Sequence, residues 1–264
     1  MLKKIIALGL VIVMALACLT ACGEKKVTVE SVQKAGKLVI GTSPDFPPFE
    51  SLSADGKVEG IEIEIMELIC AELGVELEIK QMDFDSVLPG VQTGKFDVGV
   101  SGISVTPERE KNTLFSTPYC LAAQAIVVIE GSDIKTKADL TGKTISVQTG
   151  TTAEEFCMGE GYTVKAFSAN ADAETALTTC KVDAWVIDDL TAAEMVALYN
   201  EEHPDAPLVI LPEAMTTEPY AFAFAQGSDD LVNKINEILN KLLEDGTIAE
   251  IFAKYNAPYT APQA

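Results

Sequence analysis

Apolar residues recur along this chain with two different periods, and the two kinds of segment alternate. Residues 96–101 are apolar at every second position, which is the period of a buried strand. Ile61, Ile65 and Leu68 instead recur at the spacing of one helix face. The sequence therefore predicts a protein in which strands and helices follow one another.

The same two periods extend over the rest of the chain. They predict helices over residues 29–35, 61–73, 86–93, 153–158, 171–179, 191–199, 228–244 and 247–255, and a helical turn over 137–140. They predict strands over residues 38–42, 77–80, 96–101, 121–129, 144–147, 164–167, 183–188, 208–211 and 220–225. Residues 43–49 contain three prolines and are expected to form no regular structure. Alternating strands and helices favour an α/β fold with parallel sheets, in which ligands bind at the carboxyl ends of strands.

The first residues have the pattern of a targeting segment. Lys3 and Lys4 precede an apolar run over residues 5–19, which is shorter than the roughly 20 residues of a membrane-spanning helix. The run ends in Leu-Thr-Ala-Cys, which resembles the lipobox of bacterial lipoproteins. We therefore expect residues 1–21 to be a signal peptide and Cys22 to carry a lipid. An ordinary signal peptide followed by an incidental cysteine is the alternative.

Charge and composition argue against several classes of function. The 264 residues include 19 basic and 40 acidic ones, whereas a nucleic-acid-binding protein needs a basic surface. His203 is the single histidine and stands in a polar stretch beside Pro204, which argues against histidine metal sites and Ser-His-Asp chemistry. We expect no nucleic acid, metal or cofactor.

Four cysteines follow Cys22, and their spacing matches no zinc-binding pattern. Cys70 and Cys120 stand among apolar residues and are expected to be buried thiols. Cys157 and Cys180 both stand in segments with the helical period, and the sequence leaves open whether they are bridged or reduced.

Polar groups follow three of the predicted strands. The first group is Ser101-Gly102-Ile103-Ser104, whose small residues can expose backbone amides. Thr106 and Pro107 then open a helix, and Arg109 falls on its first turn. A cation there opposes the helix dipole, so a carboxylate ligand explains Arg109 better than helix stability does.

The other two groups are residues 148–152 and Asp188. Residues 148–152, Gln-Thr-Gly-Thr-Thr, lead into a helix whose N-terminus suits an anion, and Asp188 ends a strand. A ligand with one carboxylate and one ammonium would use all three strand ends. Phe46, with Phe49 or Phe84, would supply apolar walls.

Each candidate also has a purely structural interpretation. Arg109 could pair with Glu108 or Glu110 on the surface, the phenylalanines could belong to the core, and Asp188 could cap the next helix. The position of every candidate at a strand-to-helix switch favours the binding site.

At these residues the chain resembles the extracytoplasmic polar amino-acid-binding proteins of ABC importers, solute-binding protein family 3. The segment GIEIEI at residues 60–65 looks like the signature of that family, and the resemblance runs from residues 38–42 to residues 251–255. It implies two lobes of the type II periplasmic-binding-protein fold, each a mostly parallel sheet flanked by helices, joined by a two-strand hinge.

The resemblance also implies a domain organisation and partners. Lobe 1 would comprise residues 37–122 and 220–264, lobe 2 residues 123–219, and residues 22–36 the lipidated N-terminus and linker. The expected partners are a free amino acid and the permease and ATPase subunits of an ABC importer. The expected state is a monomer outside the cytoplasm, held at the membrane by the lipid (palmitate) on Cys22.

The resemblance assigns the charged groups of the ligand first. Arg109 would bind the α-carboxylate, assisted by the hydroxyl and amide of Ser104 and by the amide of Thr152. Asp188 would pair with the α-ammonium, with the Gly102 carbonyl nearby.

The remaining candidates would surround the rest of the ligand. Phe46 and Phe84 would enclose its side chain, Gln148 and Thr151 would line the far side, and Ser101 would lie near the ammonium.

One departure from the family pattern bears on specificity. Members that bind cationic amino acids often carry Asp or Glu where this chain has Ser43. Its absence weakens an arginine or lysine assignment, although Asp45 or Glu50 could substitute. The implied ligand is a polar amino acid, with cystine or a neutral residue still open.

Two other classes of function stay open at this point. Some relatives with this fold are dehydratases that act on prephenate or arogenate, and they need a carboxylic acid over the leaving hydroxyl. Asp188 is better used on an ammonium, which argues against an enzyme. An extracellular sensor or adhesin domain is the third class, and no kinase segment follows to support it.

Overall fold

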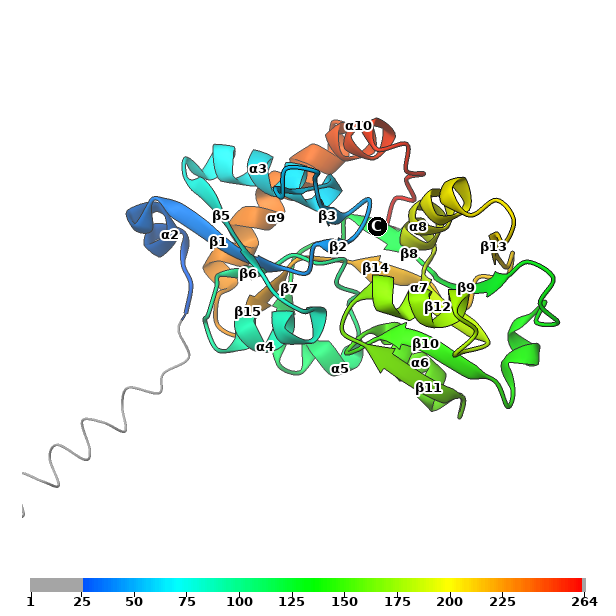
Figure 1. The fold of residues 1–264 in the computed structure, drawn as a ribbon. Helices are drawn as coiled ribbons and strands as arrows, with labels where there is room; N and C mark the ends of the chain where they lie inside the picture. Colours follow the sequence, from blue (N-terminus) through cyan, green and yellow to red (C-terminus); the bar gives the residue numbers. More distant parts are fainter. Residues whose placement is uncertain (1–25, 263–264) are drawn as a thin grey trace, which may run out of the picture.

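The computed structural model describes residues 26–262, so the predicted signal peptide and the predicted lipid site at Cys22 lie outside the described residues. Two α/β lobes lie side by side, each built on one five-stranded sheet flanked by helices (Figure 1). Lobe 1 is the lobe that contains the first strand of the chain, and lobe 2 is the other. Within the described residues, no helix combines the length and the apolar character that a bilayer crossing needs.

The sheet of lobe 1 has the order β5-β1-β6-β15-β7, formed by Glu76–Gln81, Lys37–Thr42, Val98–Gly99, Ala223–Ala225 and Thr113–Phe115. β1 is parallel to β5 and β6, whereas β15 is antiparallel to both of its neighbours. The helices of this lobe are α3 (Ile61–Leu73), α4 (Val87–Gln92), α9 (Asp229–Glu244) and α10 (Thr247–Lys254), and the preceding helix α2 (Val29–Ala35) packs against β1 and α9. Helices α9 and α10 pack beside α3, so the end of the chain completes the lobe that its beginning starts (Figure 1).

The sheet of lobe 2 repeats this arrangement with different strands. Its order is β11-β10-β12-β9-β13, formed by Thr163–Phe167, Thr144–Gln148, Ala184–Asp188, Gln124–Ile129 and Leu208–Ile210. β10 is parallel to β11 and β12, and β9 is antiparallel to β12 and β13. The helices of this lobe are α6 (Thr152–Gly159), α7 (Asn170–Thr178) and α8 (Asp189–Glu202), with the 3-10 helix η2 (Lys137–Leu140). In each sheet, four of the five strands thus run in one direction.

A two-stranded antiparallel ribbon connects the lobes. β8 (Cys120–Ala122) pairs with β14 (Glu218–Tyr220), with Ala122 opposite Glu218. A small sheet of β2 (Asp45–Phe46), β3 (Glu50–Leu52) and β4 (Val58–Glu59) precedes α3. The 3-10 helix η1 (Phe84–Ser86) and the short helix α5 (Pro107–Glu110) complete the elements that surround the boundary between the lobes.

Two predicted strands are divided in the structure. The predicted strand over 121–129 forms β8 and β9, because its apolar run continues while the chain leaves the connecting ribbon and enters the second sheet. The predicted strand over 220–225 likewise divides between β14 and β15. Hydrophobic period alone does not show that a chain changes sheets, since both sheets bury the same kind of residue.

Two further predictions need correction near the boundary between the lobes. Of the strand predicted over 96–101, only Val98–Gly99 forms β6, and the chain turns at Gly102 with a φ of 53°. The segment 43–49 does contain regular structure, because β2 pairs with β3 despite the prolines. The other predicted elements agree with the structure to within a few residues.

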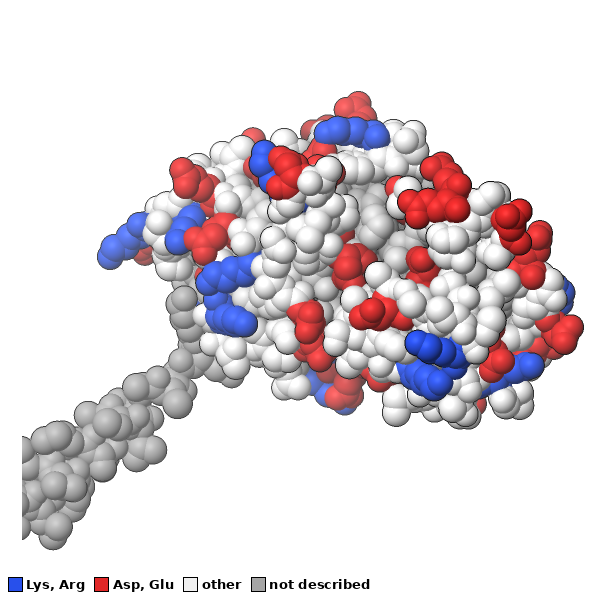
Figure 2. Space-filling view, in the orientation of Figure 1, with Lys and Arg blue, Asp and Glu red and all other residues white. Residues whose placement is uncertain are grey.

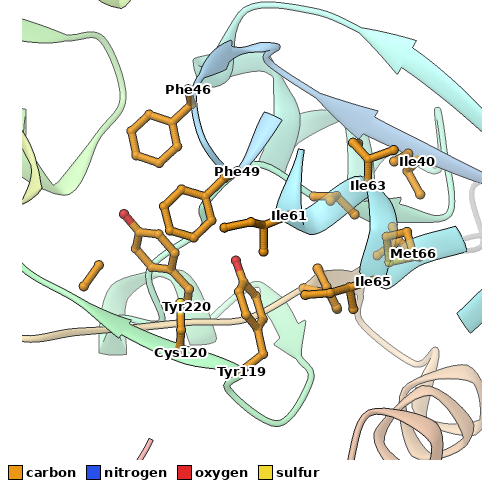
Figure 3. Close-up of a cluster of buried hydrophobic side chains, with 14 of the residues drawn as sticks. Ile40, Phe46, Phe49, Ile61, Ile63, Ile65, Met66, Tyr119, Cys120 and Tyr220 are labelled. Atoms are coloured by element: carbon orange, nitrogen blue, oxygen red, sulfur yellow. The ribbon is translucent and has the colours of Figure 1, made fainter. Parts of the chain in front are cut away.

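Helix α3 shows where an apolar pattern misleads. Ile61 and Ile65 are buried as predicted, and Gly74 ends the helix in the left-handed conformation. Leu68 is 38% exposed, because the buried stripe is centred on Glu62 and the residues one and two turns beyond it. Figure 3 shows Ile61 of α3 beside the ring of Phe49, with Ile65 and Met66 farther from the aromatic rings. The carboxylate in the middle of this stripe therefore sits inside the core of lobe 1.

The cysteines of the described chain are all free thiols. Cys70, Cys120 and Cys157 are buried, and burial raises the pKa of each thiol. Cys180 is exposed and follows α7 in a left-handed conformation, so its predicted helical position is wrong. Cys157 and Cys180 form no bridge. Among residues 26–262, no group of His, Cys, Asp and Glu side chains is arranged to hold a metal ion.

Candidate functional site

One cavity lies between the lobes, and residues of both lobes line it. Its lining consists of Phe46, Phe84, Ser101, Gly102, Ser104, Arg109, Gln148, Thr151, Thr152 and Asp188. The structure thus brings together all ten residues that the sequence analysis selects, and their role in binding stays a prediction.

Arg109 is held at the cavity by the first turn of α5. The Thr106 hydroxyl caps this turn by accepting the Arg109 backbone N–H at 3.2 Å, and Pro107 occupies the first helical position. The guanidinium donates to the Ser104 carbonyl at 3.0 Å and to the Gly150 carbonyl of lobe 2 at 3.1 Å. A guanidinium carries five N–H donors, so it keeps donors for a ligand.

The burial of Arg109 excludes the surface interpretation. Arg109 is 8% exposed. Burial lowers the pKa of its guanidinium, whereas nearby carboxylates, among them Glu218 and Asp188, raise this pKa. Among the described residues, Arg109 forms no ion pair, whereas Glu108 pairs with Lys111 instead. The guanidinium also lies 5.8 Å from the ring centre of Phe84, a distance at which a cation is attracted to an aromatic face.

Asp188 supplies the opposite charge from the end of β12. It is 7% exposed, and its Oδ1 accepts one hydrogen bond, from Gln124 Nε2 at 2.9 Å. Burial, reinforced by the charge of Glu218, raises the pKa of Asp188 to about 7. Its side chain does not cap α8, because Asp189 is the residue that accepts the Leu190 backbone N–H. A cation in the cavity would stabilise the ionised form of Asp188.

Lobe 2 also contributes the N-terminus of α6. The Thr151 hydroxyl caps this helix by accepting the Glu154 backbone N–H at 3.2 Å, and Thr152 is the first helical residue. The first amides of a helix have no partner within it, so they point to an anion or to water. Gly150 precedes them with a φ of 78°, and a side chain there would meet Asp85 of lobe 1 at 3.0 Å. The two lobes are therefore in contact at this edge of the cavity.

Of the two aromatic walls expected from the sequence, Phe46 with Phe49 or Phe46 with Phe84, the structure has the second. Phe46 and Phe84 line the cavity, while Phe49 is fully buried behind Phe46, with ring centres 5.6 Å apart (Figure 3). Gly102 lies under this wall, since a side chain at its Cα would meet the Phe46 ring at 2.5 Å. Trp185 is buried in the core and is not among the residues that line the cavity.

A pair of buried carboxyl groups supports the loop of Ser101 and Gly102 from inside lobe 1. Glu62 accepts the Gly102 backbone N–H at 2.9 Å and the Tyr119 hydroxyl at 2.5 Å. Glu50 accepts the Ser101 hydroxyl at 2.8 Å. Burial raises the pKa of both, and the charge of Glu62 raises that of Glu50 further. Glu50 does not line the cavity, so it is not placed to contact a ligand side chain as the sequence allowed.

Asp45 also lies behind the lining, where it joins the two lobes. Its Oδ2 accepts the backbone N–H of Asn170 at 2.9 Å, at the start of α7, and Gln148 Nε2 at 3.1 Å. The Ser43 hydroxyl donates to its Oδ1 at 2.9 Å. Gln148 therefore uses its amide hydrogens on protein groups, including the Ser168 carbonyl.

Glu218 is the site residue that sequence reasoning missed. It stands on β14 beside the cavity and accepts the hydroxyl of Ser104 at 2.5 Å and that of Thr152 at 2.6 Å. In the sequence it follows Thr216 and Thr217 at the predicted return between the lobes, where nothing distinguishes it from a solvated loop carboxylate. Only the pairing of β8 with β14 brings it to the site.

The surface around the cavity does not favour an anionic ligand. Figure 2 shows acidic side chains spread over both lobes on this face, with smaller clusters of basic ones. The whole chain carries a formal net charge of −21. A ligand with net negative charge would be repelled on approach, whereas a zwitterion or a cation would not.

Comparisons with known proteins point to one family. A family model described as bacterial extracellular solute-binding proteins, family 3, matches residues 38–258. The L-cystine-binding protein TcyJ of Escherichia coli (strain K12) is 29% identical over 251 residues, which cover 92% of this chain and 92% of TcyJ. The chain is similar to the P235GK mutant of ArgBP from T. maritima, with a TM-score of 0.80 and 36% identity over 87% of this chain and 99% of that one.

A third comparison concerns the enzyme alternative. The ancestral amino acid-binding protein AncCDT-1, described as a precursor of cyclohexadienyl dehydratase, is similar with a TM-score of 0.78. It is 32% identical, and the match covers 86% of this chain and 98% of AncCDT-1. TcyJ and AncCDT-1 are thus named as amino-acid-binding proteins. Another structure of ArgBP from T. maritima is described as arginine-bound.

Proposed function

Because the chain belongs to family 3 of the bacterial extracellular solute-binding proteins, we propose that it is the amino-acid-binding protein of an ABC importer. It acts outside the cytoplasm, as its family does. The protein captures one free polar amino acid between its lobes by closure and delivers it to the permease, which the ATPase subunits drive.

The observation that carries this proposal is a pair of opposite buried charges that line one cavity. Arg109 comes from lobe 1 and Asp188 from lobe 2, and neither forms an ion pair with another described residue. An amino acid carries its carboxylate and its ammonium on the same carbon, so one small molecule offers a partner to each of these two charges. A ligand with both charges would join the lobes, which is the condition for ligand-driven closure.

Each lining residue has a proposed role in this arrangement. Arg109 and the amides of Ser104 and Thr152 hold the α-carboxylate. Asp188 holds the α-ammonium. The residues around the rest of the ligand are Phe46, Phe84, Ser101, Gly102, Gln148 and Thr151. The rings of Phe46 and Phe84 support a flat or aliphatic side chain.

The same proposal covers the limits of the lobes and the attachment to the membrane. Lobe 1 comprises residues 37–122 and 220–264 and lobe 2 residues 123–219, and the support is that the ribbon of β8 and β14 stands between the two sheets. Residues 1–21 are removed as a signal peptide, and Cys22 carries the lipid (palmitate) that tethers a monomeric protein. The support for the lipid is the lipobox-like sequence.

Binding of a free amino acid can be measured directly. Gently purified protein is analysed by native mass spectrometry, and its thermal unfolding is followed with each of the common L-amino acids and L-cystine. At a ligand concentration of about 100 times Kd, a site specific for the folded state adds about 2.7 kcal/mol to the free energy of unfolding. We expect one or a few polar amino acids to raise the melting temperature at 1:1 stoichiometry. Stabilisation by none of them would contradict the proposed function.

One observation favours a dehydratase as the second candidate. Asp188 is a buried acid with a pKa of about 7, which is a suitable value for a general acid, and AncCDT-1 is described as a precursor of a dehydratase. Incubation with prephenate distinguishes the two functions, because a dehydratase forms phenylpyruvate. We expect no phenylpyruvate above the rate without protein.

A further inference from the structure

Glu218 lies where the two lobes and the cavity meet. It stands on β14, opposite Ala122 of β8, and is 7% exposed. Its Oε2 accepts the hydroxyl of Ser104 from lobe 1 at 2.5 Å and the hydroxyl of Thr152 from lobe 2 at 2.6 Å. Its Oε1 accepts the Thr216 hydroxyl at 2.8 Å. One carboxylate thus holds one lining residue from each lobe.

The direction of these hydrogen bonds limits what the two lining hydroxyls can do. A hydroxyl has one proton and two lone pairs. Because the protons of Ser104 and Thr152 point to Glu218, their hydroxyls offer only lone pairs to a ligand. One lone pair of the Thr152 hydroxyl already accepts Gln124 Nε2 at 3.3 Å. Lone pairs repel a carboxylate and attract an ammonium, so the α-carboxylate is left to Arg109 and to backbone amides.

The charge of Glu218 also reaches the two charged lining residues. It raises the pKa of both Asp188 and Arg109, which places three ionisable side chains within interaction range of one another. With Arg109 as the single cation of this group, a second carboxylate makes the site attractive to the ammonium of a ligand and unattractive to a molecule that has only a carboxylate.

We propose that Glu218 is a positioning residue of the amino-acid site: by taking the hydroxyl protons of Ser104 and Thr152, it makes these hydroxyls acceptors and so enforces selection for a ligand with an α-ammonium. This inference rests on the proposed function and deepens it. Glu218 makes no contact with the ligand itself, since it is absent from the cavity lining.

Substitution of Glu218 by Met tests the inference, because Met has a similar length and no acceptor oxygen. The probes are the best binder among L-arginine, L-histidine, L-glutamine and L-cystine, and the same molecule without its α-ammonium. In the Glu218→Met protein the freed hydroxyls can donate to a carboxylate. We expect amino-acid affinity to fall about tenfold and the preference over the deaminated molecule to narrow by about tenfold.

A double-mutant cycle adds a measurement that a merely structural role would not move. If Ser104 acts through Glu218, the effects of Ser104→Ala and Glu218→Met on affinity are non-additive, with a coupling of about fivefold or more. Glu201→Met is the matched control, since Glu201 is exposed on α8 and the same charge is removed. An unchanged preference together with additive effects would overturn the inference.

Glu218→Gln keeps the test valid where Glu218→Met does not fold, as judged by circular dichroism. Its amide oxygen still accepts the hydroxyl protons while its charge is lost, so we expect the preference for the α-ammonium to persist within about threefold. We also expect the pH at which affinity falls to move downward, because Asp188 loses a like-charged neighbour. Loss of the preference for the α-ammonium in a folded Glu218→Gln protein would contradict the inference. Wild-type protein that binds none of the four amino acids would instead overturn the proposed function.

Discussion

The two lobes share one sheet topology and differ in the charges that they bring to the cavity. The orders β5-β1-β6-β15-β7 and β11-β10-β12-β9-β13 have the same pattern of parallel and antiparallel neighbours. Lobe 1 contributes Arg109 after its sheet strand β6, and lobe 2 contributes Asp188 at the end of β12. The sheet topology is the same in both lobes, whereas the charges at the cavity are opposite. A ligand must therefore carry both charges to pair with both lobes.

The buried carboxylates of the two lobes differ in how many hydrogen bonds they accept from the protein. Glu62 of lobe 1 accepts hydrogen bonds from Gly102 and Tyr119 and serves the structure of the loop. Asp188 of lobe 2 accepts one hydrogen bond and lines the cavity. A carboxylate that the protein itself satisfies supports the fold, whereas one that is incompletely satisfied is available to a ligand.

The largest expected effect comes from removing the cation of lobe 1. Arg109→Ala should weaken amino-acid binding by about 2–5 kcal/mol, because it leaves the α-carboxylate buried and unpaired. Arg109→Lys should restore little, since a point charge cannot replace a fork of parallel donors. Titration calorimetry measures both, and Lys111→Ala, which removes an exposed cation of the same region, is the control. Full affinity in Arg109→Ala would show that lobe 1 does not hold the carboxylate.

The next effect concerns the carboxylate of lobe 2. Asp188→Asn should weaken binding by about 2 kcal/mol, because a charge-assisted hydrogen bond to the α-ammonium becomes a neutral one. Asp205→Asn, at an exposed position after α8, should leave binding unchanged. Equal affinities of the Asp188→Asn and wild-type proteins would remove Asp188 from the site.

The same residue predicts a dependence on pH. The pKa of Asp188 is raised to about 7 without ligand, and an ammonium ligand favours the ionised form. Affinity should therefore fall as pH drops below about 7, by at most about tenfold per unit, and binding near neutral pH should release a proton. Calorimetry in buffers of different ionisation enthalpy detects this proton, which Asp188→Asn should abolish.

The stability of the ligand-free protein should follow the opposite course. A carboxyl whose pKa is higher in the folded than in the unfolded state stabilises the fold most below its unfolded pKa, and this contribution is lost as pH rises through about 7. Part of the free energy of unfolding should thus be lost between pH 5 and pH 8 in wild type and retained in Asp188→Asn. The comparison uses thermal melts of dialysed protein.

A smaller effect is expected from the contact that joins the lobes behind the cavity. Asp45 of lobe 1 caps α7 of lobe 2 without lining the cavity. Asp45→Asn should destabilise the closed arrangement and weaken every ligand alike, by about 1 kcal/mol. Asp55→Asn, in an exposed turn of lobe 1, is the control. A change that differs between ligands would show that Asp45 contacts the ligand side chain instead.

The smallest effect on binding is expected from the anchor. Cys22→Ser should leave affinity unchanged and release the protein from the membrane, because the lipid is attached through the thiol. Fractionation and palmitate labelling measure this outcome. Labelling of Cys22→Ser at the wild-type level would contradict lipid attachment at Cys22.

Much of this site could be predicted because its residues follow strands that the alternation of apolar and polar residues identifies in the sequence. Arg109 stands out in the sequence because a cation on the first turn of a helix opposes the helix dipole. Its burial shows that it is not a surface residue paired with Glu108 or Glu110. The α/β class follows from alternating periods, and the two-lobed arrangement follows from the family resemblance and is confirmed.

The rest could not be predicted, because it depends on contacts between distant segments. Glu218 lies 114 residues from Ser104 and 66 from Thr152, and no local pattern links them. Glu62 occupies the centre of a buried helix stripe, where an apolar residue is the default expectation. The division of the apolar run over 121–129 depends on a change of sheet, which periodicity does not record.

The central claim is that one molecule with both charges draws the lobes together. Small-angle scattering tests it most directly, with three solutions matched in protein concentration: the bound amino acid, its analogue without the carboxylate and its analogue without the ammonium. The account predicts that the radius of gyration falls on saturation with the amino acid and stays at the ligand-free value with either analogue. Compaction with an analogue that carries only one of the charges, or none with the amino acid at saturation, would contradict it.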